Sequence, residues 1–231
     1  MSLVTTYFRM LFEPQRAFGE AMSKKVWTLL LPFFLAVLFT AILNIYYFYH
    51  VDIAWLRDQM TASMPSDQRD VIARSMTRGR FIGISIIGVC FLALTINLGR
   101  AFIYWLALKV QGVGSQGFVK LFAVVVWSTA PLLLILPAGL LNISLAPGGH
   151  LAGNDVNPVS LNQLLFHLPA SSAWGQLLST FSLVNLWEIA LIGVGIQYVS
   201  RLGMSKAMLI ALLPDAIVYG IWGLLLAVSG A

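Results

Sequence analysis

Charge is scarce in this chain of 231 residues. Asp, Glu, Lys and Arg together make up 10% of it, whereas a water-soluble domain keeps about a quarter of its residues charged. Hydrophobic residues make up 59%, in long runs that leave no polar face to turn toward water. The composition therefore excludes an ordinary soluble domain and predicts an integral membrane protein.

The residues and motifs that chemistry usually needs are also missing. Cys90 is the single cysteine, so the sequence has no disulfide framework and no CxxC motif. No GxSxG turn is present to activate a serine, and the spacing of His50, His150 and His167 matches no zinc signature. We therefore expect no enzymatic activity, no cofactor and no metal site.

Basic residues exceed acidic ones by five, but they lie between the apolar runs rather than in a block. Such a distribution argues against nucleic acid as a partner. Contact with the anionic headgroups of membrane lipids explains the same excess.

Five apolar stretches reach the roughly 20 residues that a spanning helix needs. They cover about Val26–Phe48, Phe81–Leu108, Val119–Leu145, Trp174–Ser200 and Ala207–Val228. Their continuous apolar character favours helices over barrel strands, which alternate. We predict an all-α integral membrane protein, a bundle of five transmembrane helices over residues 26–231, with a kink in the third at Pro131 and Pro137.

The distribution of Lys and Arg predicts the orientation. With the N-terminus in the cytoplasm, eight of them lie inside: Arg9, Arg16, Lys24, Lys25, Lys109, Lys120, Arg201 and Lys206. Five lie outside, all in one loop: Arg57, Arg69, Arg74, Arg78 and Arg80. We expect a cytoplasmic N-terminus and a C-terminus on the outer side.

The first 25 residues form a separate segment. Apolar residues recur there at helical spacing: Leu3, Tyr7, Met10 and Leu11, then Phe18, Ala21 and Met22 after Pro14. With basic residues between them, this pattern is typical of an interfacial amphipathic helix. A cytosolic arm packed on the bundle would bury the same stripe, and the sequence does not separate the two.

The outer loop from Tyr49 to Arg80 is predicted to hold two short helices separated by Pro65. Asp52 is placed to cap the first helix and Ser66 the second.

Three ionisable residues fall inside predicted spans, where a charge costs at least about 2.5 to 3.5 kcal/mol unless it is paired or hydrated. They are Arg100, Glu188 and Asp215. Arg100 and Asp215 come to similar depth and are predicted to form an ion pair, while Glu188 needs a proton or a partner. Asn97 and Asn185 lie about one turn away and are predicted to extend the cluster. The cluster either fixes helix register or forms a polar route.

Small residues line two helix faces. Gly79 and Gly83 form a GxxxG motif, and Ala216, Gly220, Gly223 and Ala227 follow one stripe of the fifth span. Such faces allow close helix approach, for which we favour packing within the chain over a dimer interface.

Several segments together resemble the YIP1 family of five-span membrane proteins. They are residues 14–18 (Pro-Gln-Arg-Ala-Phe), 117–122 (Gly-Phe-Val-Lys-Leu-Phe) leading to 128–131 (Ser-Thr-Ala-Pro), and Trp187 followed by 203–207 (Gly-Met-Ser-Lys-Ala). The resemblance implies a five-helix domain with a cytosolic N-terminus, in the shorter form of bacterial members, and hence a bacterial inner membrane. Eukaryotic members are associated with small GTPases. This chain has neither their long N-terminal region nor an Asp-Leu-Tyr-Gly-Pro motif, which argues against GTPase binding.

The sequence thus favours a non-enzymatic protein that organises membranes or binds lipids or other membrane proteins, alone or as an oligomer. The alternative is a small transporter or channel with a polar route through Arg100, Glu188 and Asp215.

Overall fold

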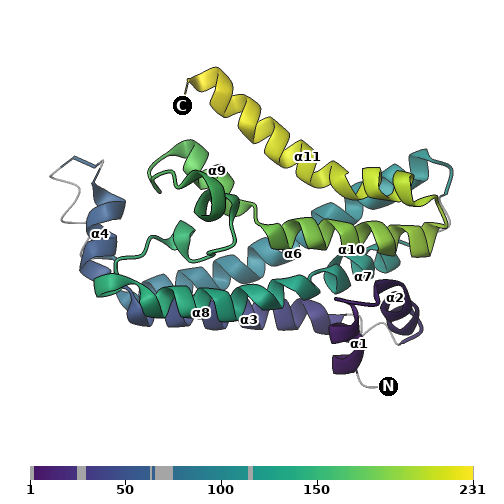
Figure 1. The fold of residues 1–231 in the computed structure, drawn as a ribbon, viewed down its shortest axis with the longest axis horizontal. Coiled ribbons are helices and arrows are strands. Elements are labelled where there is room, and N and C mark those ends of the chain that lie inside the picture. The colour runs from purple at the N-terminus through teal and green to yellow at the C-terminus, as the bar shows by residue number, and fades with distance from the viewer. Residues whose placement is uncertain (1–2, 25–29, 63, 66–74, 114–116, 231) are drawn as a thin grey trace.

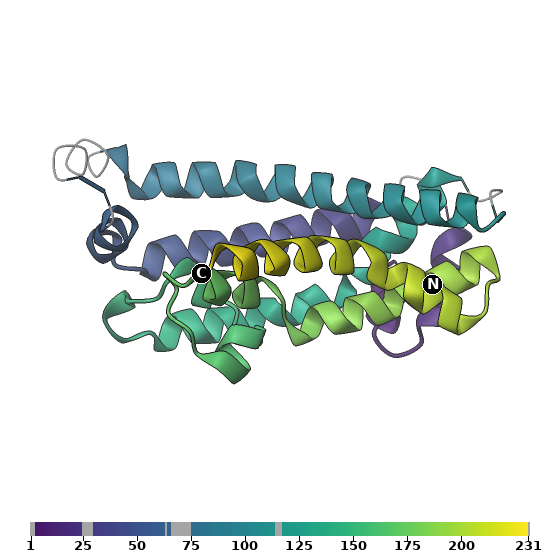
Figure 2. The same ribbon diagram turned by 90° about the horizontal axis from the view of Figure 1, so that it is seen from above.

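The computed structural model describes residues 3–24, 30–62, 64–65, 75–113 and 117–230. Within these ranges the chain is helical, with one isolated bridge and no strand. Five helical segments are long and apolar enough to span a membrane: α3 (Leu31–His50), α6 (Arg78–Val110), a broken third span (Phe118–Leu145), α10 (Leu183–Ser200) and α11 (Met204–Ser229). The predicted all-α, five-span bundle is confirmed, and Figures 1 and 2 show it from two sides.

The third span is interrupted where the sequence predicted a kink. It consists of α7 (Phe118–Ser128), the 3-10 helix η2 (Ala130–Leu134) and α8 (Ile135–Leu145). Pro131 lies in the first turn of η2, and its lack of a backbone N–H interrupts the α-helical bonding. The Ser128 hydroxyl donates to the carbonyl of Val124, one turn earlier. Polar side chains thus satisfy backbone oxygens beside the break.

The fourth apolar stretch is two helices, and the prediction of one continuous helix from Trp174 was wrong. The helix α9 (Ala173–Thr180) ends before α10 begins at Leu183. At the junction, the side-chain oxygen of Asn185 accepts hydrogen bonds from the backbone N–H of Ser182 at 2.8 Å and from its hydroxyl at 2.7 Å. This capping arrangement starts a new helix, so α10 alone forms the fourth span.

The N-terminal segment folds as two short helices, α1 (Leu3–Arg9) and α2 (Pro14–Met22), with Pro14 in the first turn as predicted. Its apolar stripe is buried in the bundle: Tyr7, Met10 and Phe18 are at most 2% exposed, and α2 lies against α7 and α10. An ion pair of Arg9 on α1 with Glu20 on α2 joins the two helices, and Arg16 pairs with the same Glu20 within α2. This stripe therefore packs on protein.

A second apolar row of the same segment faces outward. Val4, Phe8 and Phe12 follow one another at four-residue spacing and are 56%, 55% and 79% exposed. Since the first row already holds the segment on the bundle, this second row is free to enter the membrane interface.

On the opposite side, α4 (Ile53–Thr61) follows α3. Asp52 caps α4 as predicted, accepting from the backbone N–H of Ala54 and Trp55 at 2.8 and 3.1 Å. The second predicted helix of this loop, with Ser66, lies outside the described residues. Between α8 and α9 the chain forms three short turns: η3 (Pro147–Gly149), η4 (Gly153–Asp155) and η5 (Asn162–Phe166).

The main core lies toward the N-terminal side of the bundle, around Trp127, Tyr104 and Ile192. In Figure 1, α11 lies beside α10 at its start and diverges from it toward the C-terminus.

Candidate functional site

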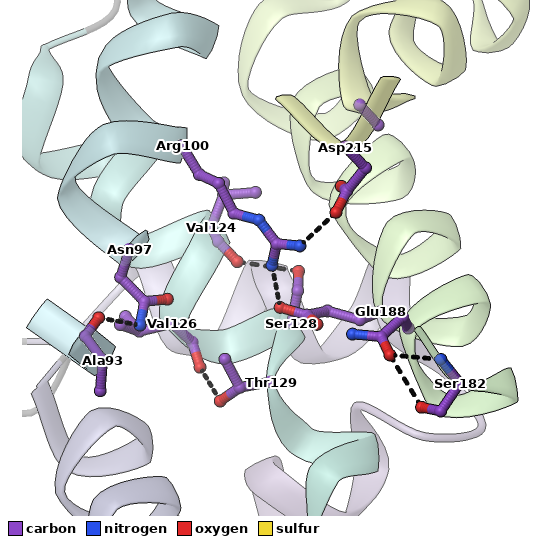
Figure 3. Close-up of polar contacts among 12 residues, drawn as sticks. Ala93, Asn97, Arg100, Val124, Val126, Ser128, Thr129, Ser182, Glu188 and Asp215 are labelled. Carbon is purple, nitrogen blue, oxygen red and sulfur yellow. Dashed lines mark hydrogen bonds and ion pairs between the residues drawn. The ribbon is translucent and has the colours of Figure 1, made fainter. Parts of the chain in front are cut away.

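The three ionisable residues of the spans meet at one point. The Nη1 atom of Arg100 on α6 lies 2.7 Å from Oε1 of Glu188 on α10, and its Nη2 atom lies 2.7 Å from Oδ1 of Asp215 on α11. Figure 3 shows the guanidinium between the two carboxylates. The predicted pair of Arg100 with Asp215 is present, and Glu188 shares the same cation. We call these three residues the ionic cluster.

The ionic cluster is largely removed from solvent. The side chains of Arg100, Glu188 and Asp215 are 13%, 4% and 10% exposed. Charges at this depth persist because they are paired and hydrogen-bonded. One guanidinium faces two carboxylates, so the cluster carries one negative charge in excess when both are ionised. The Oδ2 atom of Asp215 is buried with no hydrogen-bond partner among the described residues.

Pro214 directly precedes Asp215, lies inside α11 and is buried. Because it has no N–H, it leaves the carbonyl of Ile210, four residues earlier, without its usual helical donor. The hydroxyl of Tyr104, fully buried on α6, donates to the carbonyl of Ala211 at 3.0 Å. This bond joins α6 to α11 one turn before Asp215. Tyr104 and Pro214 were not predicted to belong to the site, although a proline directly before an intramembrane carboxylate is a visible signal in the sequence.

The two asparagines do not extend the ionic cluster, so that prediction was wrong. Asn97 donates from Nδ2 to the carbonyl of Ala93 in its own helix at 2.7 Å, and Asn185 caps the start of α10. Both amides bond locally, because helix carbonyls and helix starts offer partners closer than Arg100. Figure 3 shows Asn97 turned toward Ala93.

A cavity of about 600 Å³ adjoins the ionic cluster. It lies between α3, α6, η2, α10 and α11, and is lined mostly by apolar side chains; Arg100, Glu188 and Asp215 form part of its wall. Its volume lies within the range of about 300 to 1,000 Å³ that small-molecule sites have. Apolar walls with a few convergent polar groups are typical of such sites.

The cavity opens sideways at the level of the spans. Leu92 and Ile96 of α6 and Val218 of α11 line it and are 57%, 50% and 57% exposed. In a spanning bundle, side chains exposed at this level face hydrocarbon. A molecule would therefore enter the cavity from the bilayer.

Most other polar side chains of the cavity wall already have partners. The hydroxyls of Thr40, Thr129 and Thr180 donate to carbonyls of their own turns, and that of Tyr219 donates to Thr180. Among the lining residues that the structure describes, the buried acceptor left without a partner is Oδ2 of Asp215.

The structure does not show the packing predicted for the small residues. A Cβ added at Gly79, Gly83 or Gly220 would meet no atom within 4 Å, and at Gly223 it would only reach Trp174 at 4.0 Å. Ala216 and Ala227 are exposed. The divergence of α11 and the exposure of the first half of α6 explain the difference. Close approach occurs instead at Gly193, beside Met208, and at Gly195, beside Phe18 and Val124.

The histidines lie in the segments outside the cavity. His150 stacks on Trp55 with its Nε2 atom 3.7 Å from a carboxylate oxygen of Asp52. His50 contacts the carbonyl of Tyr46, and His167 adopts a left-handed backbone conformation. No group of three potential metal ligands occurs in the part of the chain that was described.

These features define a class: a polytopic helical membrane protein in which a buried ionic cluster borders a cavity open to the bilayer. The chain belongs to the Yip1 domain family, whose model matches residues 8–227. This result confirms the resemblance seen in the sequence.

A curated relative is the membrane protein YknW of Bacillus subtilis strain 168. It is 28% identical over 152 residues, which are 65% of this chain and 59% of that protein. The chain thus spans less than two thirds of the length of this relative. No solved structure matches the chain.

Proposed function

We propose that this protein is a non-enzymatic membrane protein that binds a lipid or another amphipathic molecule of the bilayer. The observation that carries this proposal is the 600 Å³ cavity, whose opening lies at the level of the spans and whose wall includes the ionic cluster. An amphiphile has an apolar part for the walls and a polar part for the cluster. No other described feature offers both surfaces together.

The shape of the bundle supports the proposal. A purely structural ion pair would be enclosed by packed helices, as the core around Trp127 is. Here α11 diverges after the ionic cluster, so Arg100 and Asp215 border open space. Helices of a folded bundle otherwise close such gaps by van der Waals packing.

A photoreactive long-chain alcohol in liposomes tests the cavity. Gly99 lines the cavity and a Cβ there meets no atom within 4 Å, so Gly99→Leu should fill part of the space without a clash. We expect labelling of peptides from α3, α6 and α11, reduced about tenfold in Gly99→Leu. Gly83→Leu is the matched control, because Gly83 is on the same helix and equally open but lies outside the cavity. Equal labelling of both variants would refute the proposal.

The second candidate is a small transporter or channel, favoured by one observation. The excess carboxylate of the ionic cluster borders a cavity, so an ion or proton that reached the cavity would find an acceptor. Flux of protons or cations into liposomes that disappears in Glu188→Gln would favour this function. Cavity labelling without flux would favour lipid binding.

The proposed location is a bacterial inner membrane with the N-terminus in the cytoplasm. The bacterial origin of the relative and the distribution of basic residues support it. Membrane lipids are the proposed partners, with other membrane proteins and further copies of the chain as candidates.

A further inference from the structure

We propose that the cavity selects amphiphiles with a cationic head, such as an ammonium group on an apolar chain, over neutral or anionic ones. This inference rests on the proposed function, because it names the class of molecule that the cavity would bind. It follows from the charges and hydrogen bonds of the ionic cluster.

Arg100 is the cation that an anionic head would need. Both terminal nitrogens of its guanidinium already contact carboxylates at 2.7 Å. A phosphate or carboxylate head that reached the remaining N–H groups of Arg100 would lie beside Glu188 and Asp215, and with both ionised it would add negative charge to a site that already has one in excess. Like charges in a medium of low dielectric constant repel strongly.

The Oδ1 atom of Asp215 binds Arg100, whereas its Oδ2 atom is buried without a partner among the described residues. A buried acceptor without a donor costs free energy, and more so when it is charged. An ammonium group supplies both the N–H donor and the positive charge that balances the second carboxylate.

Apolar side chains of the cavity would hold the apolar chain of the bound amphiphile. Phe33 and Val37 of α3, Leu92 and Ile96 of α6 and Val218 of α11 line the cavity beside the cluster. They provide an apolar path from the open side to Asp215. A head bound at Asp215 thus leaves its chain among these residues and the surrounding lipid.

Three probes with the same decyl chain test the inference: decylammonium, decanol and decanoate, each titrated onto the full-length protein in nanodiscs of zwitterionic lipid. Gly99→Leu provides the background of partitioning into lipid. We expect decylammonium to bind at least tenfold more tightly than decanol at neutral pH, and decanoate more weakly than decanol. Equal affinities, or a preference for decanoate, would overturn the inference.

A variant separates charge from shape. Asp215→Asn keeps the size of the side chain but removes the excess charge, so decylammonium should lose its tenfold advantage while decanol binds unchanged. An equal loss for both probes would overturn the charge argument. If this variant does not fold, the comparison of the three probes on the unchanged protein still decides.

The same experiment distinguishes the two proposals. If Gly99→Leu changes the binding of none of the probes, the cavity is not a ligand site and the proposed function fails. If Gly99→Leu weakens the binding of all three probes equally, the cavity binds amphiphiles and the proposed function holds. In that case only the proposed preference for a cationic head fails.

Discussion

Arg100 is the residue on which the ionic cluster depends, because it is the shared partner of Glu188 and Asp215. Replacing it by Gln leaves two buried carboxylates without a cation, a loss that costs about 3 to 5 kcal/mol in buried pairs. We therefore expect Arg100→Gln to lower the unfolding temperature in detergent strongly and to reduce the folded yield. Thermal unfolding followed by gel filtration measures both.

Neutralising the carboxylates as well should restore stability in steps. Arg100→Gln with Asp215→Asn should be more stable than Arg100→Gln alone, and the triple variant with Glu188→Gln more stable again. Lys120→Gln, which removes an exposed charge, serves as the control and should leave the unfolding temperature unchanged. If each further substitution lowers the unfolding temperature by an additive amount, the three charges act independently.

Asp52 is a charged residue outside the spans whose pKa is lowered. The backbone N–H of Trp55 and then of Ala54 donate to its carboxylate, and His150 adds to the effect. Because the pKa of Asp52 is lowered in the folded state, its ionised carboxylate stabilises α4 at pH values above the ordinary pKa of 3.8. This contribution is lost as the pH falls through the folded pKa. We predict that the amides of α4 lose protection from hydrogen exchange, corrected for intrinsic rates, below about pH 4.

Two substitutions check this prediction at neutral pH. Asp52→Ala should lose protection in α4 because the cap is gone. Asp52→Asn accepts the same hydrogen bonds without the charge, so it should keep part of the protection, with little dependence on pH. Loss of protection in Asp52→Asn equal to that in Asp52→Ala would show that the capping bonds do not hold α4.

At the scale of helices, the sequence predicted which spanning helices exist better than it predicted the residues at which each helix begins and ends. Apolar length is a strong signal, so five spans were visible, and Pro131 marked the break in the third. The start of α10 was missed because the bilayer criterion counts apolar residues and ignores caps, although Ser182 and Asn185 carry a recognisable capping pattern. The stripes of small residues led to a wrong prediction of helix packing, because Gly and Ala occur both where helices pack closely and where a helix faces lipid.

The outward row of the N-terminal segment is formed by Val4 and Phe8 of α1 and by Phe12, which follows α1. We predict that this row lies in the membrane interface. In a Cys90→Ser background, a nitroxide at Phe8→Cys should relax faster with oxygen, which partitions into lipid, than with a water-soluble nickel chelate. A label at the exposed position Gln15→Cys is the control and should show the reverse. Equal accessibility of both labels to the nickel chelate would place α1 in water.

At the scale of the molecule, the site depends on how three distant segments meet. Arg100, Glu188 and Asp215 could be identified from the sequence, because ionisable residues stand out in apolar spans. Which carboxylate Arg100 binds, and that it binds both, depends on the rotation of α10 and α11 about their axes. The cavity was not predictable, since it arises from the divergence of α11 after Pro214, a feature of helix packing rather than of composition.

The distribution of basic residues also predicts how the whole molecule is oriented in the membrane. The two ends of the chain lie at opposite ends of the bundle (Figure 1), as five spans require. Eight basic residues on the N-terminal side against five on the other predict a cytoplasmic N-terminus. Alkaline phosphatase fused to the C-terminus should therefore be active, and a fluorescent protein there dark. Bright fluorescence at the C-terminus would reverse the assignment.

The charge count can be shifted deliberately. Lys109→Gln with Lys120→Gln leaves six basic residues on the N-terminal side, eight minus two, still more than five, so the orientation should hold. Adding Arg201→Gln and Lys206→Gln leaves four, eight minus four, fewer than the other side has, and both reporters should then give signal from a mixed population. Because the ionic cluster lies within the spans, Arg100 counts for neither side. An unchanged reporter pattern in the fourfold variant would show that the N-terminal helices, rather than the loops, set the orientation.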